Sequence, residues 1–285
     1  MGDLSSVRYD LHEQVRELKF PRFPVTTFKV CAEGGIMSDR FKRAVFILLV
    51  LPSFASAMGR RSTDERSAKL PQVVVIDAGH GGKNEGAIVH GRRERDIVLA
   101  LSLKLQEQLE ARPGISPFLT RWADEFVSLT DRVSRAEEVG GRLFLSLHVD
   151  NNRVRKGRGV MVYVYGRNKT IPKGPEREPD EKILPPPPGK QVKQSRRFAA
   201  HIGKTLKKSG IRTAGYVDKG PFAVLKSKEM PSVLVELGNL RDRSEARQVS
   251  NPAFQDRLAE ALADGIESFL KERYGPLPGH SAATR

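Results

Sequence analysis

Short apolar runs alternate along the chain with longer segments whose apolar residues recur every three or four positions. The short runs are typical of buried strands, and they occupy residues 72–77, 115–120, 142–147, 159–164, 222–225 and 232–237. The longer segments predict amphipathic helices at residues 94–112, 128–139, from 192 onwards, and 251–273. Strands that alternate with helices over unequal connections predict an α/β fold with three layers, in which helices flank a mixed six-stranded sheet.

The segments without this pattern set the expected domain boundaries. We expect a single catalytic domain over residues 71–274, interrupted at 166–194 by an insertion rich in proline and charge. A polar linker over residues 58–70 precedes this domain. A tail over residues 275–285, which contains proline and glycine, follows it.

The segment before the linker has the features of an export signal. Residues 37–57 combine a basic start, an apolar run too short to cross a bilayer, and the small-residue ending Ala55-Ser56-Ala57. A short buried helix or an uncleaved anchor is the alternative interpretation. Residues 1–36 form an extension before this segment, and they would be absent from the protein if translation began at Met37. We therefore expect an exported protein of the periplasm or extracellular envelope, with no stable membrane span after cleavage near Met58.

The net charge limits the kinds of binding partner that we expect, and the cysteine content limits the residues that could bind a metal. The formal net charge is +15, and the only cysteine, Cys31, precedes the expected cleavage site. A basic surplus favours an anionic envelope polymer or a membrane surface, or it serves solubility alone. The sequence has no recognition-helix motif and no basic stretch interleaved with aromatic residues, so we expect no nucleic acid partner. Any metal in the mature chain must be bound by His, Asp or Glu.

Two histidines and two glutamates lie at strand ends or at a helix start, where α/β folds usually place catalytic and ligand-binding residues. The run V-V-V-I-D-A-G-H brings His80 to the exit of the first strand, and F-L-S-L-H brings His148 to the exit of a later one. Glu94 lies on the apolar face of a helix, in its first turn, and Glu236 ends the last strand. Two imidazoles and one carboxylate form the ligand set of a hydrolytic Zn2+ ion, and a second carboxylate can act as general base. His90 is the substitute ligand, although we expect it at the surface.

Six motifs follow one another in order between residues 73 and 269. They are V-I-D-A-G-H-G-G, G-R-R-E-R-D, L-T-R, S-L-T-D-R, F-L-S-L-H and V-L-V-E-L-G. In these motifs the chain resembles the zinc-dependent N-acetylmuramoyl-L-alanine amidases of bacterial cell-wall hydrolysis. The resemblance implies that His80, Glu94 and His148 bind Zn2+ and that Glu236 is the catalytic base. It also implies cleavage of peptidoglycan at the amide between the muramic lactyl group and the first L-alanine of the stem peptide.

Two other functions use the same residue types. One is a zinc carboxypeptidase-like peptidase, although its usual H-x-x-E ligand pair differs from the wide separation of His80 and Glu94. The other is a non-catalytic peptidoglycan-binding protein. Some amidases resembling this chain carry, at the place of residues 166–194, an insertion that blocks the site until an activator protein binds. We therefore expect the insertion to gate access, with a carboxylate that caps the metal from Glu176, Glu178 or Glu181.

Overall fold

The structure is a computed structural model that describes residues 70–152, 158–167 and 183–279. The expected signal segment 37–57, the extension before it and most of the linker lie outside these residues. Glu176, Glu178 and Glu181 also lie outside them. Among the residues that are described, no helix combines the length and the apolar character needed to cross a lipid bilayer.

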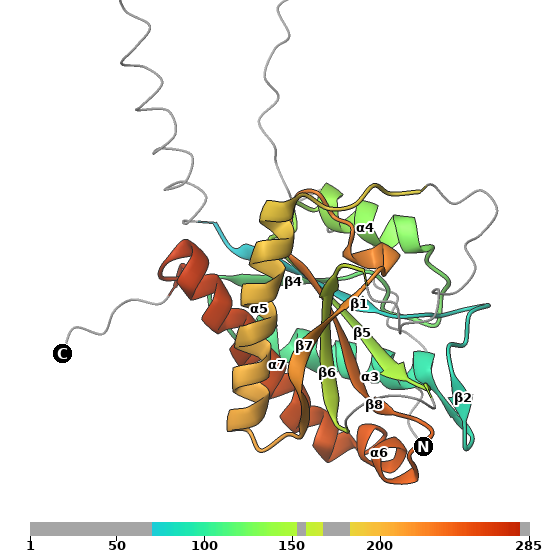
Figure 1. Ribbon diagram of the computed structural model, residues 1–285. Helices are drawn as coiled ribbons and strands as arrows, with labels where there is room; N and C mark the ends of the chain where they lie inside the picture. The colour runs from blue at the N-terminus through green and yellow to red at the C-terminus, as the bar shows by residue number, and fades with distance from the viewer. Residues whose placement is uncertain (1–69, 153–157, 168–182, 280–285) are drawn as a thin grey trace, which may run out of the picture. The chain divides into compact units, whose positions relative to one another are not determined.

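A mixed six-stranded sheet forms the centre of the fold, as predicted (Figure 1). In spatial order its strands are β4 (Ile115–Leu119), β1 (Gln72–Ala78), β5 (Leu143–Asp150), β8 (Ser232–Asn239), β6 (Val160–Tyr165) and β7 (Thr213–Gly220). The first four are parallel, β6 runs antiparallel to β8, and β7 is parallel to β6. The carboxyl ends of β1, β5 and β8 therefore meet at one edge of the sheet, where ligands bind in open α/β folds.

Helices cover both faces of the sheet and complete the three predicted layers. On one face lie α3 (Glu94–Glu110), α7 (Pro252–Tyr274) and α5 (Gly189–Lys208), with α7 between the other two. The other face is covered by α4 (Leu129–Glu138) and by the short 3-10 helix η1 (Ala223–Leu225). The spans of α3, α4 and α7 agree closely with the spans predicted from the periodicity of apolar residues.

Each strand sends alternate side chains to the two helical layers. Leu145 and Leu147 of β5 are buried in the apolar cluster that includes α3, α5 and α7, whereas Phe144 belongs to the cluster with α4 and η1. In steps of two along the strands, His148 of β5 and Glu236 of β8 lie on the same side of the sheet as Phe144. Both therefore project from the sheet face that carries α4, away from α5.

One predicted strand is wrong. Residues 222–225 contain η1 instead of a strand, and the sixth strand is β7 (Thr213–Gly220). Since β7 lies at the edge of the sheet and contains two glycines and two charged residues, it lacks the apolar run by which a buried strand is recognised. The apolar character of 222–225 has another cause, because Val224 and Leu225 are buried in the cluster beneath α4.

The predicted insertion at 166–194 is too long at its carboxyl end, because α5 already begins at Gly189. Sequence periodicity also missed α6 (Arg243–Val249), which follows β8, and the hairpin formed by β2 (Ile88–Val89) and β3 (Arg92–Arg93). These elements are too short for a period of two or 3.6 residues to be recognised.

Candidate metal centre

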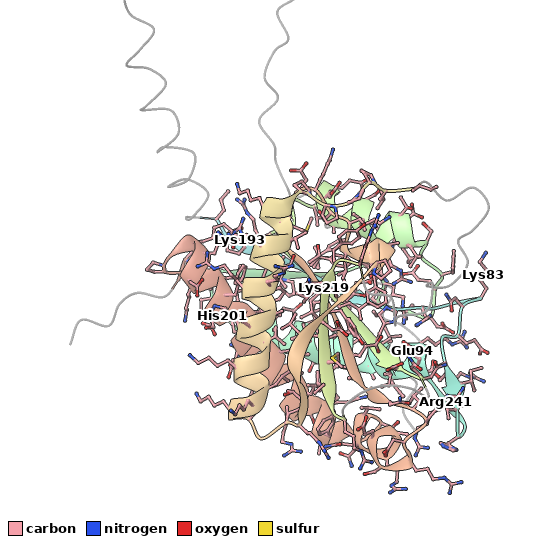
Figure 2. The ribbon with its side chains drawn as sticks, viewed as in Figure 1. Lys83, Glu94, Lys193, His201, Lys219 and Arg241 are labelled. Atoms are coloured by element: carbon pink, nitrogen blue, oxygen red, sulfur yellow. The ribbon has the colours of Figure 1, made fainter. Side chains whose placement is uncertain are left out.

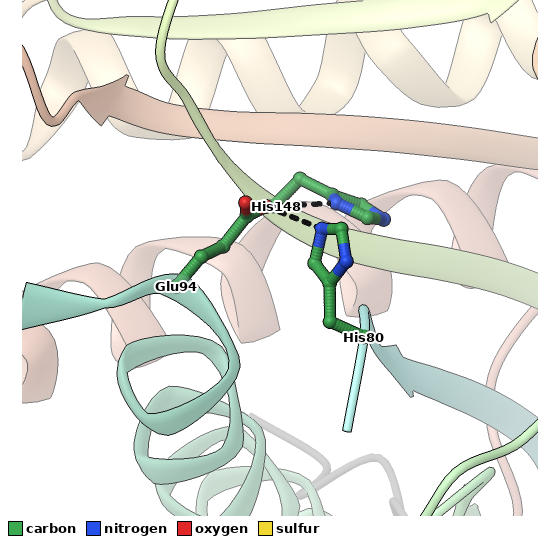
Figure 3. A group of neighbouring side chains, drawn as sticks. All are labelled: His80, Glu94 and His148. Atoms are coloured by element: carbon green, nitrogen blue, oxygen red, sulfur yellow. Dashed lines mark hydrogen bonds and ion pairs between the residues drawn. The ribbon is translucent and has the colours of Figure 1, made fainter. Parts of the chain in front are cut away.

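His80, Glu94 and His148 lie together at the carboxyl edge of the sheet (Figure 3). His80 follows β1, His148 belongs to β5, and Glu94 opens α3. Oε1 of Glu94 lies 3.0 Å from Nε2 of His80 and 2.9 Å from Nδ1 of His148. One potential ligand atom from each residue lies within 4.8 Å of the other two. Two imidazole nitrogens and a carboxylate oxygen at this spacing can hold a divalent metal ion.

The backbone around His80 adopts left-handed conformations that few side chains accept. The φ angle is 60° at His80, 118° at Gly81 and 55° at Gly82. Such a conformation costs a residue other than glycine about 1–2 kcal/mol, so surrounding contacts must stabilise His80. Gly79 is needed for a different reason, because a Cβ atom there would lie 2.3 Å from Cε1 of His148. The glycines thus permit both the sharp turn and the close approach of the two histidines.

Two buried arginines hold this loop by its carbonyl oxygens. Arg132 of α4 donates to the carbonyl of His80 at 2.7 Å, and Arg121 donates to the carbonyl of Gly79 at 2.8 Å. The same nitrogen of Arg121 also donates to the carbonyl of Arg95 at 3.0 Å, in the first turn of α3. Arg121 therefore joins the loop that carries one histidine to the helix that carries the glutamate.

A buried ion pair fixes Arg132. Nη1 of Arg132 lies 2.7 Å from Oδ1 of Asp77, and the two side chains are 3% and 0% exposed. Thr120 and Ser146 donate their hydroxyls to the same carboxylate at 2.6 and 2.7 Å. Burial alone would raise the pKa of Asp77, but the charge of Arg132 and these hydrogen bonds outweigh it and hold the pKa below its ordinary value. Asp77 is therefore charged at neutral pH.

Replacing Arg132 with methionine is expected to destabilise the fold by about 3–5 kcal/mol at pH 7, because Asp77 stays buried without its cation. In the wild type, Asp77 stabilises the fold above its ordinary pKa, and this contribution is lost as the pH falls through the lowered folded pKa. The deficit of the variant is therefore expected to shrink as the pH falls towards about 4, where Asp77 can take a proton. Urea unfolding at several pH values measures both effects.

The matched control is Arg135→Met. Arg135 lies on the same helix and donates to the carbonyl of Thr120 at 2.7 Å. Its loss is expected to destabilise the fold by only about 1 kcal/mol, as for a single hydrogen bond. Equal losses in the Arg132 and Arg135 variants, or a loss in the Arg132 variant that does not change with pH, would show that the ion pair contributes less than proposed.

Glu94 is held by backbone groups as well as by the histidines. Its Oε2 accepts the N–H of Ala87 at 2.9 Å, and its Oε1 accepts the N–H of Val149 at 3.0 Å. The carbonyl of Ala87 in turn accepts the backbone N–H of Glu94 at 2.9 Å. Burial opposes the charge of Glu94, but hydrogen bonds from His148 and His80 prevail and hold its pKa far below the usual range. Glu94 therefore carries a negative charge and could bind a metal ion together with the two histidines.

Asn84 sets the proton position on His80. Its Oδ1 lies 2.9 Å from Nδ1 of His80, and because this oxygen can only accept, Nδ1 carries the proton. Nε2 is then left to face Glu94. Burial lowers the pKa of His80, but the hydrogen bond and charge of Glu94 raise it above the ordinary value. A second proton and a metal ion therefore compete for the same place beside Glu94.

Glu236 lies beside His148 on the same face of the sheet. The two residues are partners in the parallel pairing of β5 with β8, and partners on neighbouring strands are about 5 Å apart. The sequence had indicated that Glu236 ends the last strand. The strand continues to Asn239, however, so Glu236 lies inside β8. The residue is partly exposed. It therefore stands next to the cluster of His80, Glu94 and His148, with its Oε2 buried.

The other histidines in the described part of the chain lie elsewhere. His90 is exposed in the turn between β2 and β3, which agrees with the surface position expected for it. His201 of α5 contacts Ser268 and Glu272. Sequence reasoning did not identify Asn84 as a site residue, and the only local signal was its place in the glycine-bounded loop G-G-K-N-E-G.

A three-layer α/β domain with two histidines and a glutamate gathered at the carboxyl edge of its sheet is typical of a metal-dependent hydrolase. Residues 74–268 match the family described as N-acetylmuramoyl-L-alanine amidase. The chain belongs to this family.

Individual relatives agree with this assignment. The chain is 32% identical, over 70% of its length, to N-acetylmuramoyl-L-alanine amidase AmiA from Escherichia coli strain K12, of which it covers 76%. It is 27% identical, over 71% of its length, to amidase AmiC from Escherichia coli O6:H1, but it spans only 54% of that relative. The solved catalytic domain of CwlV, an N-acetylmuramoyl-L-alanine amidase from Bacillus (Paenibacillus) polymyxa var. colistinus, is 30% identical with a TM-score of 0.58. That match covers 70% of this chain and 98% of the CwlV domain.

Proposed function

We propose that this chain is a zinc-dependent N-acetylmuramoyl-L-alanine amidase that degrades peptidoglycan. The bond it cleaves is the amide between the lactyl group of N-acetylmuramic acid and the L-alanine of the stem peptide. The observation that carries the proposal is the cluster of His80, Glu94 and His148, whose ligand atoms lie within 4.8 Å of one another in a chain of the amidase family.

The chemistry of these three residues fits zinc. Two imidazoles and one carboxylate give Zn2+ three protein ligands and leave a position for water, as in hydrolytic zinc sites. Asn84 keeps Nε2 of His80 directed at the cluster, and backbone N–H groups hold Glu94. When bound there, zinc supplies Lewis acidity, which polarises a carbonyl group and makes water a stronger acid.

Glu236 is the residue that we propose moves the proton. It is anchored on β8 beside His148, on the face of the sheet where the proposed ligands meet, and the residue is partly exposed. The carboxylate accepts a proton from the attacking water and returns it to the amine nitrogen of L-alanine as the amide bond breaks. This role needs no residue beyond those already at the edge of the sheet.

Digestion of purified sacculi, followed by mass spectrometry, tests the function. We expect release of intact stem peptides that begin with L-alanine, with the glycan strands uncut. A chelator is expected to stop this release, and added Zn2+ is expected to restore it. Trimmed stem peptides would instead indicate a carboxypeptidase-like peptidase, and binding without any product would indicate a non-catalytic wall-binding protein.

We also propose that the protein acts outside the cytoplasmic membrane, in the periplasm or the extracellular envelope. Its proposed substrate is a cell-wall polymer, and residues 37–57 have the basic, apolar and small-residue order of an export signal. N-terminal sequencing of protein recovered from the envelope is expected to begin near Met58. A start well upstream of this residue would contradict cleavage at the predicted site.

We propose further that an activator protein controls access to the site through residues 166–194. The support is the position of residues 166–188 of this segment between β6 and α5, and the segment's content of proline and charge. Deletion of residues 168–182 is expected to change the rate of sacculus digestion. An unchanged rate, together with no stimulation by envelope extracts, would contradict a gating role.

A further inference from the structure

Helix α5 (Gly189–Lys208) presents a surface of one charge sign. Its sequence contains seven Lys and Arg residues and no Asp or Glu. At about 100° per residue, the seven fall within roughly one third of the helix circumference, opposite buried residues such as Phe198 and Ile202. All are exposed. We call them the α5 stripe: Lys190, Lys193, Arg196, Arg197, Lys204, Lys207 and Lys208.

The α5 stripe is unfavourable for the helix itself. Lys193 stands three and four positions before Arg196 and Arg197, and Lys204 stands at the same spacings before Lys207 and Lys208. Like charges at these spacings lie next to each other on a helix and repel. Within the described residues, the stripe forms one ion pair, between Arg197 and Glu272. The fold therefore leaves most of this charge available to an external anion.

The neighbouring helix does not neutralise the stripe, although α7 carries several acidic residues. Asp256 of α7 pairs with Lys104 of α3. Asp264 and Glu267 pair with Arg112, just beyond the carboxyl end of α3, at 2.7 and 2.6 Å. These pairs lie on the side of α7 that faces α3. Glu272 alone forms an ion pair with the stripe among the described residues.

A groove beside α5 continues the basic surface. It lies between α5 and strands β6 and β7, at the edge of the sheet, and has a volume of about 700 Å³. Its lining is mostly small or apolar, with Ala199 and Gly203 among the residues of α5. Lys204, Lys207 and Arg212 are the charged residues of this lining, which includes no carboxylate. An extended chain with anionic groups would match both the shape and the charge.

We propose that the α5 stripe and this groove bind peptidoglycan, through stem-peptide carboxylates remote from the bond being cleaved. This inference rests on the proposed function, since a wall amidase meets a polymer that repeats carboxylates along its length. The stripe offers repeated cations over ~27 Å of helix. Its partner would therefore be the substrate polymer itself, held at a second place.

The position of α5 allows both contacts at once. His148 and Glu236 project from the sheet face that carries α4, whereas α5 covers the other face. Figure 2 shows Lys193 on α5 well separated from Glu94 at the metal centre. A membrane fits this surface less well, because a helix that binds at a bilayer interface inserts an exposed apolar face. The apolar face of α5 is buried in the core instead.

A triple variant of the full chain, K193Q/K204Q/K207Q, tests the proposal by co-sedimentation with purified sacculi. We expect roughly tenfold weaker binding than the wild type at 0.1 M salt. The difference is expected to disappear at 1 M salt, where the Debye length falls from about 10 Å to about 3 Å. Cleavage of a soluble muropeptide, which is too small to reach both sites, is expected to stay at the wild-type rate.

The matched control is R243Q/R247Q/R257Q, which removes the same charge from exposed positions on α6 and α7. It is expected to bind sacculi like the wild type, and equal binding by the two triple variants would overturn the proposal. Binding of the same variants to phosphatidylglycerol vesicles is measured as a second test. If K193Q/K204Q/K207Q loses vesicle binding but keeps sacculus binding, the surface belongs to a membrane and the proposal is wrong. Failure of the wild type to cleave the muropeptide would overturn the proposed function alone.

Discussion

Glu236→Gln is expected to slow amide cleavage on sacculi by a factor of about 10²–10⁴ while the zinc content stays at the wild-type level. Glutamine keeps the size of the side chain and its place beside His148, but it cannot take a proton from water. Because Glu236 lies outside the cluster formed by His80, Glu94 and His148, zinc should remain bound. Product release measured by mass spectrometry, set against metal content in the same preparation, tests both parts.

Glu260→Gln is the control, since Glu260 is exposed on α7 and lies on the other side of the sheet. It is expected to cleave at the wild-type rate. A wild-type rate in Glu236→Gln would mean that another group takes the proton. Loss of zinc from that variant would mean that Glu236 serves as a ligand, which its place outside the three-residue cluster does not favour.

The central strands of the fold were predictable because both of their faces are buried. β1 and β5 read as continuous apolar runs, and each pairs with a strand on either side. β7 lies at the edge of the sheet, so little selects for an apolar run there, and its glycines and charges concealed it. The apolar run at 222–225 misled the prediction because side-chain burial beneath α4 does not require a strand.

The candidate ligands were predictable for a different reason, which is that strand ends have a defined place in an α/β fold. The exits of β1 and β5 are adjacent in the sheet, so His80 and His148 meet as their positions indicated. The register that sets Glu236 beside His148 could not be read from sequence, because it depends on how β5 and β8 align.

The supporting contacts were the least predictable part of the site. Arg132 reaches the carbonyl of His80 across 52 positions of sequence, and Arg121 reaches that of Gly79 across 42. Nothing in the motifs that contain these arginines indicates that their partners are backbone carbonyls of a left-handed loop. The contact of Asn84 with His80 likewise depends on the turn made by that loop. Residue types thus identified the candidate ligands, whereas the tertiary structure alone shows what orients them.

Glu94→Gln is expected to weaken zinc binding by more than about a hundredfold, and cleavage of sacculi should fall with it. Loss of a residue that only orients a ligand typically costs a factor of about 10–100 in metal affinity, and Glu94 is a proposed ligand itself. The variant also removes the negative charge that faces both histidines at 3.0 and 2.9 Å. Zinc affinity is measured by competition with a chelating dye, independently of activity.

Stability measured without zinc separates the loss of metal from damage to the fold. Glutamine can satisfy only one of the two backbone donors that Glu94 accepts, from Ala87 and Val149, so a loss of about 1–3 kcal/mol is expected. Glu85→Gln is the matched control, because Glu85 lies in the loop between His80 and Glu94, and its side chain, which is 38% exposed, forms ion pairs with Arg93 and Arg95. It should retain wild-type zinc affinity. Glu94→Gln protein that binds zinc as tightly as this control would mean that the metal is held without Glu94.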